Sequence, residues 1–313
     1  MPTTPLNKIP HNTRPKVLLL GNGLNRAYGT STWQDIIGKI SCDSLEDYKS
    51  KGLENLPYPL QAIIYTHDNV NEGVDIIADH LLNEGVADEL AEQLQELAGM
   101  QFDAILTTNY SYDIEKALLP DFKCLKGCPS KYRCSSNKGK TSEEQFGIFK
   151  YMHIETENAT NNIWHIHGEA ARTNSMVLGH YYYGNLVSTM QQHINSFMAR
   201  YRGCYSYNTA FQPLSWIDYF MMGDVYILGL SLDPSEFDLW WLINCKKRHK
   251  NETNLGTIYW FEPNLDSKET AYKKLLAQDN DIEVITETIN KNKYREYYKS
   301  AIKAINEKMN KEA

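Results

Sequence analysis

Residues 16–25 read KVLLLGNGLN, and this stretch decides the fold class. A short apolar run that fits a buried strand is followed at once by Gly21-Asn22-Gly23, which suits a tight turn into a helix. Glycines at such a turn let the backbone approach a diphosphate, and the amides at the start of the next helix would face it. The stretch lacks the complete GxGxxG fingerprint, so a tight turn without a ligand is an equal alternative for this motif alone.

Five more short apolar runs also fit buried strands, and several of them end in small or polar residues. They are Asp103–Leu106, Ile163–Ile166, Val225–Leu228, Gly256–Phe261 and Ile282–Ile285. Each run is short enough for a strand and too short for a buried helix. We therefore predict six buried strands.

Apolar residues at helical spacing fill the intervals between these runs. The three stripes comprise Leu82, Val86, Leu90, Leu94 and Leu97; Val187, Met190, Ile194, Phe197 and Met198; and Tyr294, Tyr298, Ala301 and Ile305. We expect all three to face the core. Strands that alternate with helices predict an α/β fold, a Rossmann-like, mostly parallel sheet with helices on both faces. Ligands of such sheets bind at the carboxyl ends of the strands.

The 313 residues contain no internal repeat and no long Pro- or Gly/Ser-rich linker. We expect a single domain over residues 1–313, with a core at about 14–290 and a C-terminal helix at about 290–310. Residues 34–80, which look helical and irregular, and the cysteine-containing residues 120–150 are interpreted as insertions.

Composition excludes several classes of protein. An aromatic content of 12% argues against a disordered chain, and a net charge of −7 argues against a nucleic-acid-binding surface. We expect a cytoplasmic protein that does not bind a membrane, because we find neither a signal peptide nor an apolar run of the length that spans a bilayer. The basic cluster Lys246–Lys250 is predicted to be a solvated helix end.

Three of the six cysteines, Cys124, Cys128 and Cys134, lie close together in the sequence. With a fourth ligand such as His153 they could bind zinc. Their spacing lacks the CxxC pairs of familiar zinc modules, so we favour a loop of reduced cysteines and predict no metal.

The second apolar run leads into Thr107-Thr108-Asn109-Tyr110, with Asp113 and Glu115 at the start of a helix. Polar side chains at the end of a buried strand are costly unless they form hydrogen bonds. Asn109 could bind a sugar hydroxyl or a water, and helix capping by Thr108 or Asn109 is the simpler alternative.

The third run contains His165 and leads into His167-Gly168-Glu169. Strand alternation would place both histidines on the same face, and Gly168 would leave His167 at the edge of a cleft. Histidine is the side chain best suited to proton transfer near neutral pH. For His165 we favour a structural role, and Glu169 is interpreted as a carboxylate at the end of a turn.

Taken in order, four segments resemble the sirtuin-like domains of prokaryotic antiphage systems, such as the effector of the Thoeris system. They are residues 21–25 with 33–37, residues 107–110 with 114–118, residues 167–169, and residues 227–231 with Asp233-Pro234. Met176–Leu178 and the Tyr-rich run that follows them fall where that family has a strand and a helix. The resemblance covers roughly residues 14–290 and also extends to abortive-infection H type proteins.

The resemblance implies roles for individual residues. Asn109 and His167 match the catalytic pair of the family, and Gly21, Gly23, Gly229 and Ser231 match positions that line the dinucleotide. We expect Asn22, Asn25, Thr108 and Asp113 to lie beside the bound NAD as well. The first loop differs from the family's usual GAG followed by Ser, and Ser111 stands where the family usually has Asp.

The function implied is an NAD hydrolase that releases nicotinamide and ADP-ribose, with NAD as substrate and no cofactor, acting as a toxic effector in antiphage defence. The alternative is a non-catalytic sensor or scaffold that binds NAD or ADP-ribose. A protein-lysine deacylase is less favoured, because the two CxxC pairs that follow the catalytic histidine in deacylating sirtuins are not evident. We also expect control by homo-oligomerisation or by a separately encoded regulatory partner. Aromatic residues between 195 and 222 could form such an interface or pack in the core.

Overall fold

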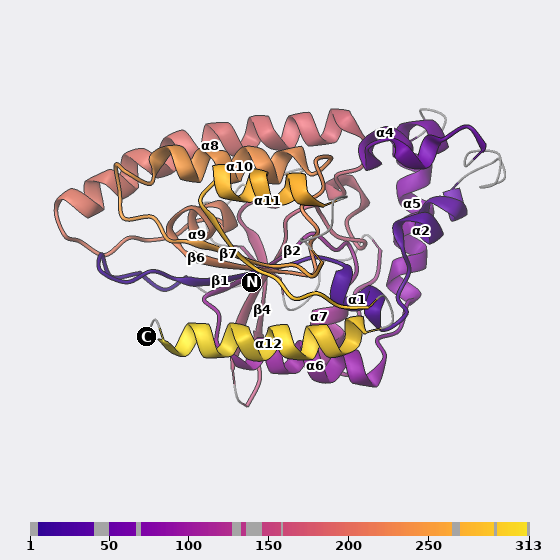
Figure 1. Cartoon of the computed structure of the whole chain (residues 1–313), viewed down its shortest axis with the longest axis horizontal. Helices are drawn as coiled ribbons and strands as arrows, with labels where there is room; N and C mark the ends of the chain where they lie inside the picture. Colours follow the sequence, from indigo (N-terminus) through magenta and orange to yellow (C-terminus); the bar gives the residue numbers. More distant parts are fainter. Residues whose placement is uncertain are drawn as a thin grey trace.

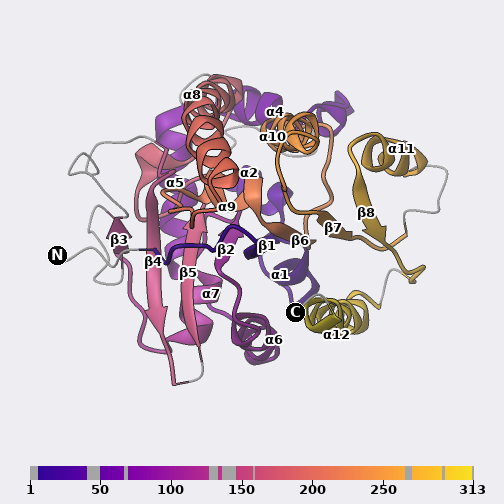
Figure 2. The same ribbon diagram turned by 90° about the vertical axis from the view of Figure 1, so that its left-hand side faces the viewer.

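Eight strands of the described residues form one sheet, in the order β3-β4-β5-β2-β1-β6-β7-β8 (Figure 2). The computed structural model describes residues 6–40, 50–66, 70–126, 133–135, 146–157, 159–264, 270–290 and 293–311. In chain order, the strands are β1 (Lys16–Leu20), β2 (Ala104–Thr107), β3 (Arg133–Ser135), β4 (Lys150–Glu155), β5 (Thr160–His165), β6 (Asp224–Leu228), β7 (Ile258–Phe261) and β8 (Ile282–Ile285).

The six predicted apolar runs all form strands, and these strands run parallel to one another from β5 across to β8. The predicted α/β, Rossmann-like fold is therefore confirmed. Two further strands, β4 and β3, extend the sheet in antiparallel fashion beyond β5, with Met152 paired to Ile163 and Arg133 to Met152. They were not predicted, and β3 lies in the region interpreted as a cysteine-containing insertion.

The described helices, again in chain order, are α1 (Gly23–Ala27), α2 (Trp33–Ile40), α4 (Tyr58–Tyr65), α5 (Val70–Asn83), α6 (Asp88–Gly99), α7 (Asp113–Leu118), α8 (His180–Ser206), α9 (Trp216–Met222), α10 (Phe237–His249), α11 (Ala271–Asp279) and α12 (Tyr294–Lys311). Short 3-10 turns, η1 and η2, lie at Leu53–Asn55 and Thr173–Ser175. None of the helices in the described part of the chain combines the length and apolar character that a bilayer crossing needs.

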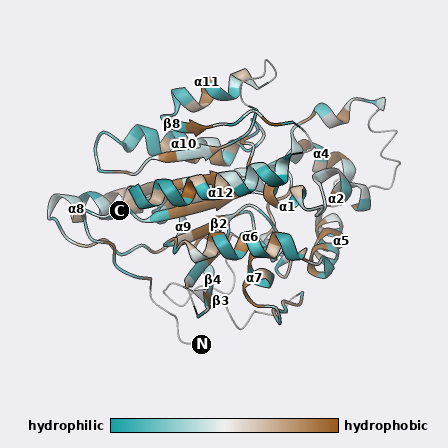
Figure 3. Cartoon of the chain, turned by 60° about the horizontal axis from the view of Figure 1, so that its bottom comes forward, coloured by the Kyte–Doolittle hydropathy of each residue, from teal (hydrophilic) through white to brown (hydrophobic). Residues whose placement is uncertain are grey.

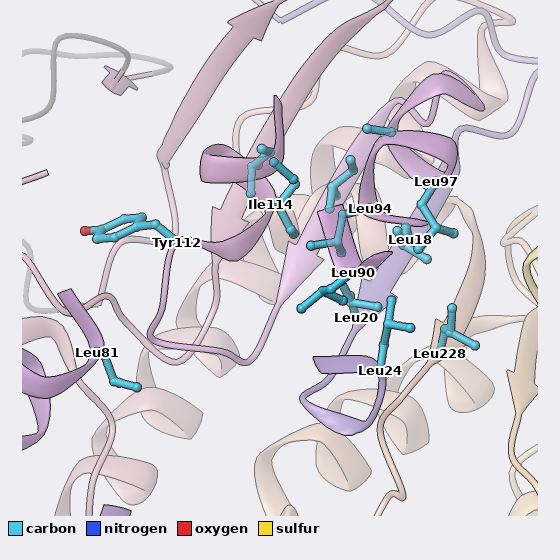
Figure 4. Close-up of a cluster of buried hydrophobic side chains, with 14 of the residues drawn as sticks. Leu18, Leu20, Leu24, Leu81, Leu90, Leu94, Leu97, Tyr112, Ile114 and Leu228 are labelled. Carbon is cyan, nitrogen blue, oxygen red and sulfur yellow. The ribbon is translucent and has the colours of Figure 1, made fainter. Parts of the chain in front are cut away.

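The central strands are buried on both faces. Leu18 and Leu20 of β1 pack in a cluster with α6, α7 and α12, whereas Val17 and Leu19 pack with α8, α9 and α10. Figure 2 shows these two helical layers on opposite sides of the sheet, and Figure 4 shows part of the first cluster around Leu18. This two-sided burial explains why the strands read as continuous apolar runs.

The three predicted helical stripes have different outcomes. The stripe of α8 is buried except for Val187, and that of α12 is buried except for Tyr294, which is 37% exposed. In the aromatic stretch after residue 195, Phe197, Tyr201 and Trp216 pack in the core. Figure 3 shows hydrophilic residues along the visible sides of α6 and α12, as expected for helices that cover a sheet.

The spacing of the stripe from Leu82 to Leu97 suggested a single helix, but the stripe spans two helices. α5 ends at Asn83 and α6 begins at Asp88, with Gly85 in the connection. Ala87 adopts an extended conformation before α6, so the helical path is interrupted there. Leu90 and Leu97 face the core, but Leu82 belongs to the preceding helix.

Two smaller expectations are wrong. Met176–Leu178 forms no strand, and its backbone instead bonds to the turn after β5, with Val177 N–H donating to the His167 carbonyl at 2.8 Å. Lys246 is not solvated, since it is 2% exposed and its Nζ donates to the carbonyl oxygen of Phe220 at 2.8 Å and to that of Gly223. These carbonyls lie at the end of α9, where a cation is favoured.

The helices α2, α4 and α5 of the 34–80 region lie together at one end of the sheet (Figure 1). α2 contacts both α4 and α5, and α4 also contacts α8. Because α1 follows β1 at this same end, these helices stand beside the carboxyl ends of the parallel strands. The region interpreted as an insertion therefore supplies a wall next to the place where ligands of parallel sheets bind.

Candidate active site

A cavity of about 570 Å³ opens at the carboxyl ends of β1, β2, β5, β6 and β7. β1 and β6 are neighbours whose following strands, β2 and β7, lie on opposite sides of them. Such a switch in strand order leaves a crevice between the two diverging loops. The cavity lies at this crevice, and Trp33 of α2 and Tyr58 of α4 line its other side.

Most of the residues predicted for the site line this cavity. Those that do are Asn22, Gly23, Thr108, Asn109, Asp113, His167, Gly229 and Ser231. Gly21 and Asn25 do not line it, and both lie in the packing beneath the loop that follows β1. These eight residues come from the segments that follow four strands, β1, β2, β5 and β6.

The glycines of the first loop serve loop-to-loop packing. A Cβ atom added to Gly21 would lie 2.5 Å from the Gly229 carbonyl oxygen, and one added to Gly23 would lie 2.7 Å from the same oxygen. The Gly21 and Gly23 amides donate to the carbonyl oxygens of Leu228 and Gly229, at 2.9 and 2.7 Å. Gly229 itself has a φ of +68°, which favours glycine. The amides of Gly21 and Gly23 are therefore already bonded to the end of β6 and the loop that follows it.

Asn25 supports the cavity floor through Asp113. Its Nδ2 donates to Asp113 Oδ2 at 2.6 Å, and the Ser111 hydroxyl donates to the same oxygen. Burial raises the pKa of the Asp113 carboxyl, with the Ser111 hydrogen bond acting in the opposite direction. Asn25 is thus a buried positioning residue for the start of α7.

Asn109 has a fixed backbone and an available side chain. Its N–H donates to Thr107 Oγ1 at 3.1 Å, and its carbonyl oxygen accepts from His165 Nδ1 at 2.8 Å. Within the described ranges, the side-chain amide of Asn109 has no hydrogen-bond partner, and the residue lines the cavity. A bound molecule can therefore use both its amide donor and its carbonyl acceptor.

His165 is the buried structural histidine that we expected. Besides its bond to Asn109, its Nε2 lies 2.9 Å from Glu115 Oε1, and both groups are almost fully buried. Burial would lower the pKa of His165, but the Glu115 carboxylate outweighs it and raises the pKa to about 9. Because both partners only accept hydrogen bonds, both ring nitrogens carry a proton, and His165 is an imidazolium with no free nitrogen.

His167 occupies a different environment two residues later. β5 ends at His165, and His167 lies in the following turn against Tyr183 of α8, with ring centroids 5.5 Å apart. His165 instead packs on Tyr112, so the prediction that both rings share one face is wrong. The strand ends before alternation can apply to His167, and only His167 lines the cavity.

Asp238 of α10 pairs with the His167 ring. Asp238 Oδ2 lies 2.9 Å from His167 Nε2, and the two side chains are 1% and 4% exposed. Burial would lower the pKa of His167, but the Asp238 carboxylate, its hydrogen bond and the charge of Glu236 raise it above its usual value. This arrangement can accept, hold and release a proton at the cavity wall.

Residues 103–285, more than half of the chain, match the SIR2-like domain. The chain belongs to this family. The SIR2-like match runs from the start of β2 to the end of β8 and includes Asn109, His167, Gly229 and Ser231. Membership indicates NAD-related chemistry. A search of curated proteins finds no match to this chain.

Two carboxylates of the SIR2-like cavity were not predicted. Glu236, just before α10, lines the cavity, and burial raises its pKa to about 7 although His167 opposes the rise. Glu262, just after β7, lines the opposite end, and burial raises its pKa to about 7 as well. Glu262 directly follows the predicted strand Gly256–Phe261, which was an available signal, whereas Glu236 and Asp238 lie well beyond the predicted strand Val225–Leu228 and carried none.

His167, Glu236 and Asp238 also form the set of described residues that could hold a metal ion. One donor atom from each lies within 4.8 Å of the others. A histidine with two carboxylates is a donor set that zinc accepts. The cysteine cluster, for which we favoured a loop without metal, is separate from this set: Cys124 is buried, Cys128 lies outside the described residues and so does the side chain of Cys134.

Proposed function

We propose that this protein cleaves the bond between nicotinamide and ribose in NAD, releasing nicotinamide and ADP-ribose. The supporting observation is the pairing of an available amide, Asn109, with a buried histidine of raised pKa, His167, in one cavity of a SIR2-like domain. The cavity volume of about 570 Å³ lies within the usual range of small-molecule sites.

Cleavage of the nicotinamide–ribose bond needs little covalent catalysis by the protein. The bond breaks through an oxocarbenium-like state, and the leaving nicotinamide takes the bonding electron pair as its ring becomes neutral. Asn109 would orient the attacking water or the ribose hydroxyls, which is a positioning contribution. His167 would accept the proton that the water loses.

The charges that line the cavity fit a cationic transition state. Glu84, Asp113, Glu236 and Glu262 contribute carboxyl groups, and an ionised carboxylate in such a site stabilises developing positive charge. Among the described lining residues, Arg26 is the one Lys or Arg. We assign the diphosphate to Arg26, the nicotinamide ribose to the Asn109 side and the adenosine ribose to the Glu262 side.

The resemblance to antiphage effectors also suggests a role for NAD cleavage in the cell. Unchecked cleavage of NAD would be toxic to the cell that makes the enzyme. We therefore propose an effector of abortive infection that is controlled by self-association or by a separate regulatory partner.

The test is nicotinamide release, followed by chromatography, when the purified protein is incubated with NAD over a range of protein concentrations. We expect release by the wild type and loss of release in both Asn109→Ala and His167→Ala. Binding of NAD without release at any concentration, or with any encoded partner, would favour the sensor instead. NAD consumption that requires an acetylated peptide would favour the deacylase.

A further inference from the structure

The Asp238–His167 pair is satisfied on one side only. Asp238 Oδ2 contacts His167 Nε2, whereas Asp238 Oδ1 has no hydrogen-bond partner in the described part of the chain. Asp238 does not line the cavity, but His167 does. The carboxylate therefore stands behind the ring, and the opposite side of the ring is the one available to a bound molecule.

This placement determines which ring nitrogen carries the proton. An ionised carboxylate only accepts hydrogen bonds, so the proton of a neutral His167 resides on Nε2. Nδ1 then carries the lone pair, and it has no hydrogen-bond partner among the residues that the structure describes. A carboxylate that fixes a histidine tautomer in this way leaves the far nitrogen ready to act as a base.

We propose that Asp238 is a positioning residue that fixes the Nε2–H tautomer of His167 and makes Nδ1 the proton acceptor. The proposal rests on the proposed NAD cleavage. In that step a water oxygen forms a bond to ribose C1′ as the C1′–N bond to nicotinamide breaks. The electron pair of the broken bond stays on the nicotinamide nitrogen, and the proton of the water moves to Nδ1. The resulting imidazolium is paired with Asp238 until it releases its proton to solvent.

The surroundings of His167 support a positioning role for Asp238 and a base role for His167. The titratable groups that face it are Asp238 of α10, Glu236 just before α10 and Tyr183 of α8, and Tyr110 after β2 in turn neighbours Tyr183. Burial raises the pKa of both tyrosines, so they stay neutral near pH 7. The charged partners of His167 are therefore the two carboxylates, and of these only Asp238 is hydrogen-bonded to the ring.

The test combines ring-nitrogen NMR of ¹⁵N-histidine protein with steady-state kinetics on the full chain. The His167 signals are assigned with His167→Gln. In the wild type we expect the proton of neutral His167 on Nε2 and a titration above pH 6.5, the ordinary value. Asp238→Asn should lower the pH at which His167 titrates. The substitution should also shift the proton of the neutral ring towards Nδ1, because an amide can donate to Nε2. It should also lower kcat about 10²-fold with KM little changed.

A matched control is a second buried pair away from the cavity. His193 Nε2 lies 2.6 Å from Asp218 Oδ1, and neither residue lines the cavity. Asp218→Asn should lower thermal stability but leave the pH profile of kcat and the His167 signals unchanged.

Several results would overturn the proposal. An Nδ1–H tautomer in the wild type would do so by itself, which keeps the test decisive if Asp238→Asn does not fold. Unchanged kcat in Asp238→Asn would do the same, as would activity lost with EDTA and restored by Zn²⁺, because the trio would then be metal ligands. If the tautomer is as expected but no nicotinamide is released, the proposed function fails and the pairing stands.

Discussion

His165 and His167 are two residues apart, and each pairs with a buried carboxylate at 2.9 Å, yet their environments differ in one decisive respect. His165 uses both ring nitrogens within the protein, one on the Asn109 carbonyl and one on Glu115. His167 uses only Nε2, and its cavity side is left for a ligand. A fully bonded histidine stabilises the fold, whereas a half-bonded one at a cavity is available for chemistry.

The largest expected effect separates the two histidines by activity. His167→Ala removes the proposed base, so we expect nicotinamide release to fall by about 10²–10⁴-fold. The melting temperature should fall as well, because the buried Asp238 carboxylate loses its partner, so the rate is compared on preparations shown to be folded. Chromatographic rates and thermal melts of the same preparations provide the measurement. A His167→Ala protein that keeps wild-type activity would remove the distinction between the two rings.

The second effect concerns stability. Glu115→Gln leaves the buried His165 cation without its counter-charge, and breaking such a pair typically costs about 3–5 kcal/mol of unfolding free energy. Urea unfolding at pH 6.5 would measure it. An unfolding free energy equal to that of the wild type would show that Glu115 is not the main partner of His165.

The pH dependence of stability sharpens the same point. Folding raises the pKa of His165 from 6.5 to about 9, so its contribution to stability is full below pH 6.5 and is lost as the pH rises towards 9. The wild type should therefore lose more unfolding free energy than Glu115→Gln over this interval. Urea unfolding at several pH values in this interval would measure both proteins. If the unfolding free energies of the wild type and Glu115→Gln change in parallel with pH, the assignment to His165 is wrong.

The smallest effect tests the second carboxylate beside His167. An ionised Glu236 raises the pKa of His167, so Glu236→Gln should lower that pKa and move the acidic limb of kcat/KM to lower pH. The shift should be smaller than in Asp238→Asn, because Glu236 is not hydrogen-bonded to the ring. Profiles of nicotinamide release against pH would compare the two variants. An equal or larger shift for Glu236→Gln would show that Asp238 is not the main partner of His167.

The fold could be predicted from the sequence because two-sided burial makes each parallel strand an unbroken apolar run. The antiparallel β4 was missed, since Lys150–Glu155 carries charged residues at both ends beside a cysteine-containing segment. The break between α5 and α6 was also missed, because helical spacing continues across Gly85 although the backbone does not.

The site could be predicted only in part, for a related reason. Asn109 and His167 directly follow strands, so a parallel sheet brings them together whatever the details. The pairing of His167 with Asp238 joins residues 71 positions apart and depends on how α10 packs behind the ring, which no spacing encodes. Gly21 and Gly23 were expected to line the dinucleotide; Gly23 lines the cavity and Gly21 does not, and both amides bond to the end of β6 or the loop after it.

The central claim is that His167, and not His165, meets the substrate. Ring-nitrogen NMR of ¹⁵N-histidine protein, recorded before and after addition of NAD, tests it most directly. We predict that NAD shifts the His167 signals, while His165 keeps two protonated nitrogens and unchanged shifts. Signals of His165 that move with NAD while those of His167 stay in place would contradict the account.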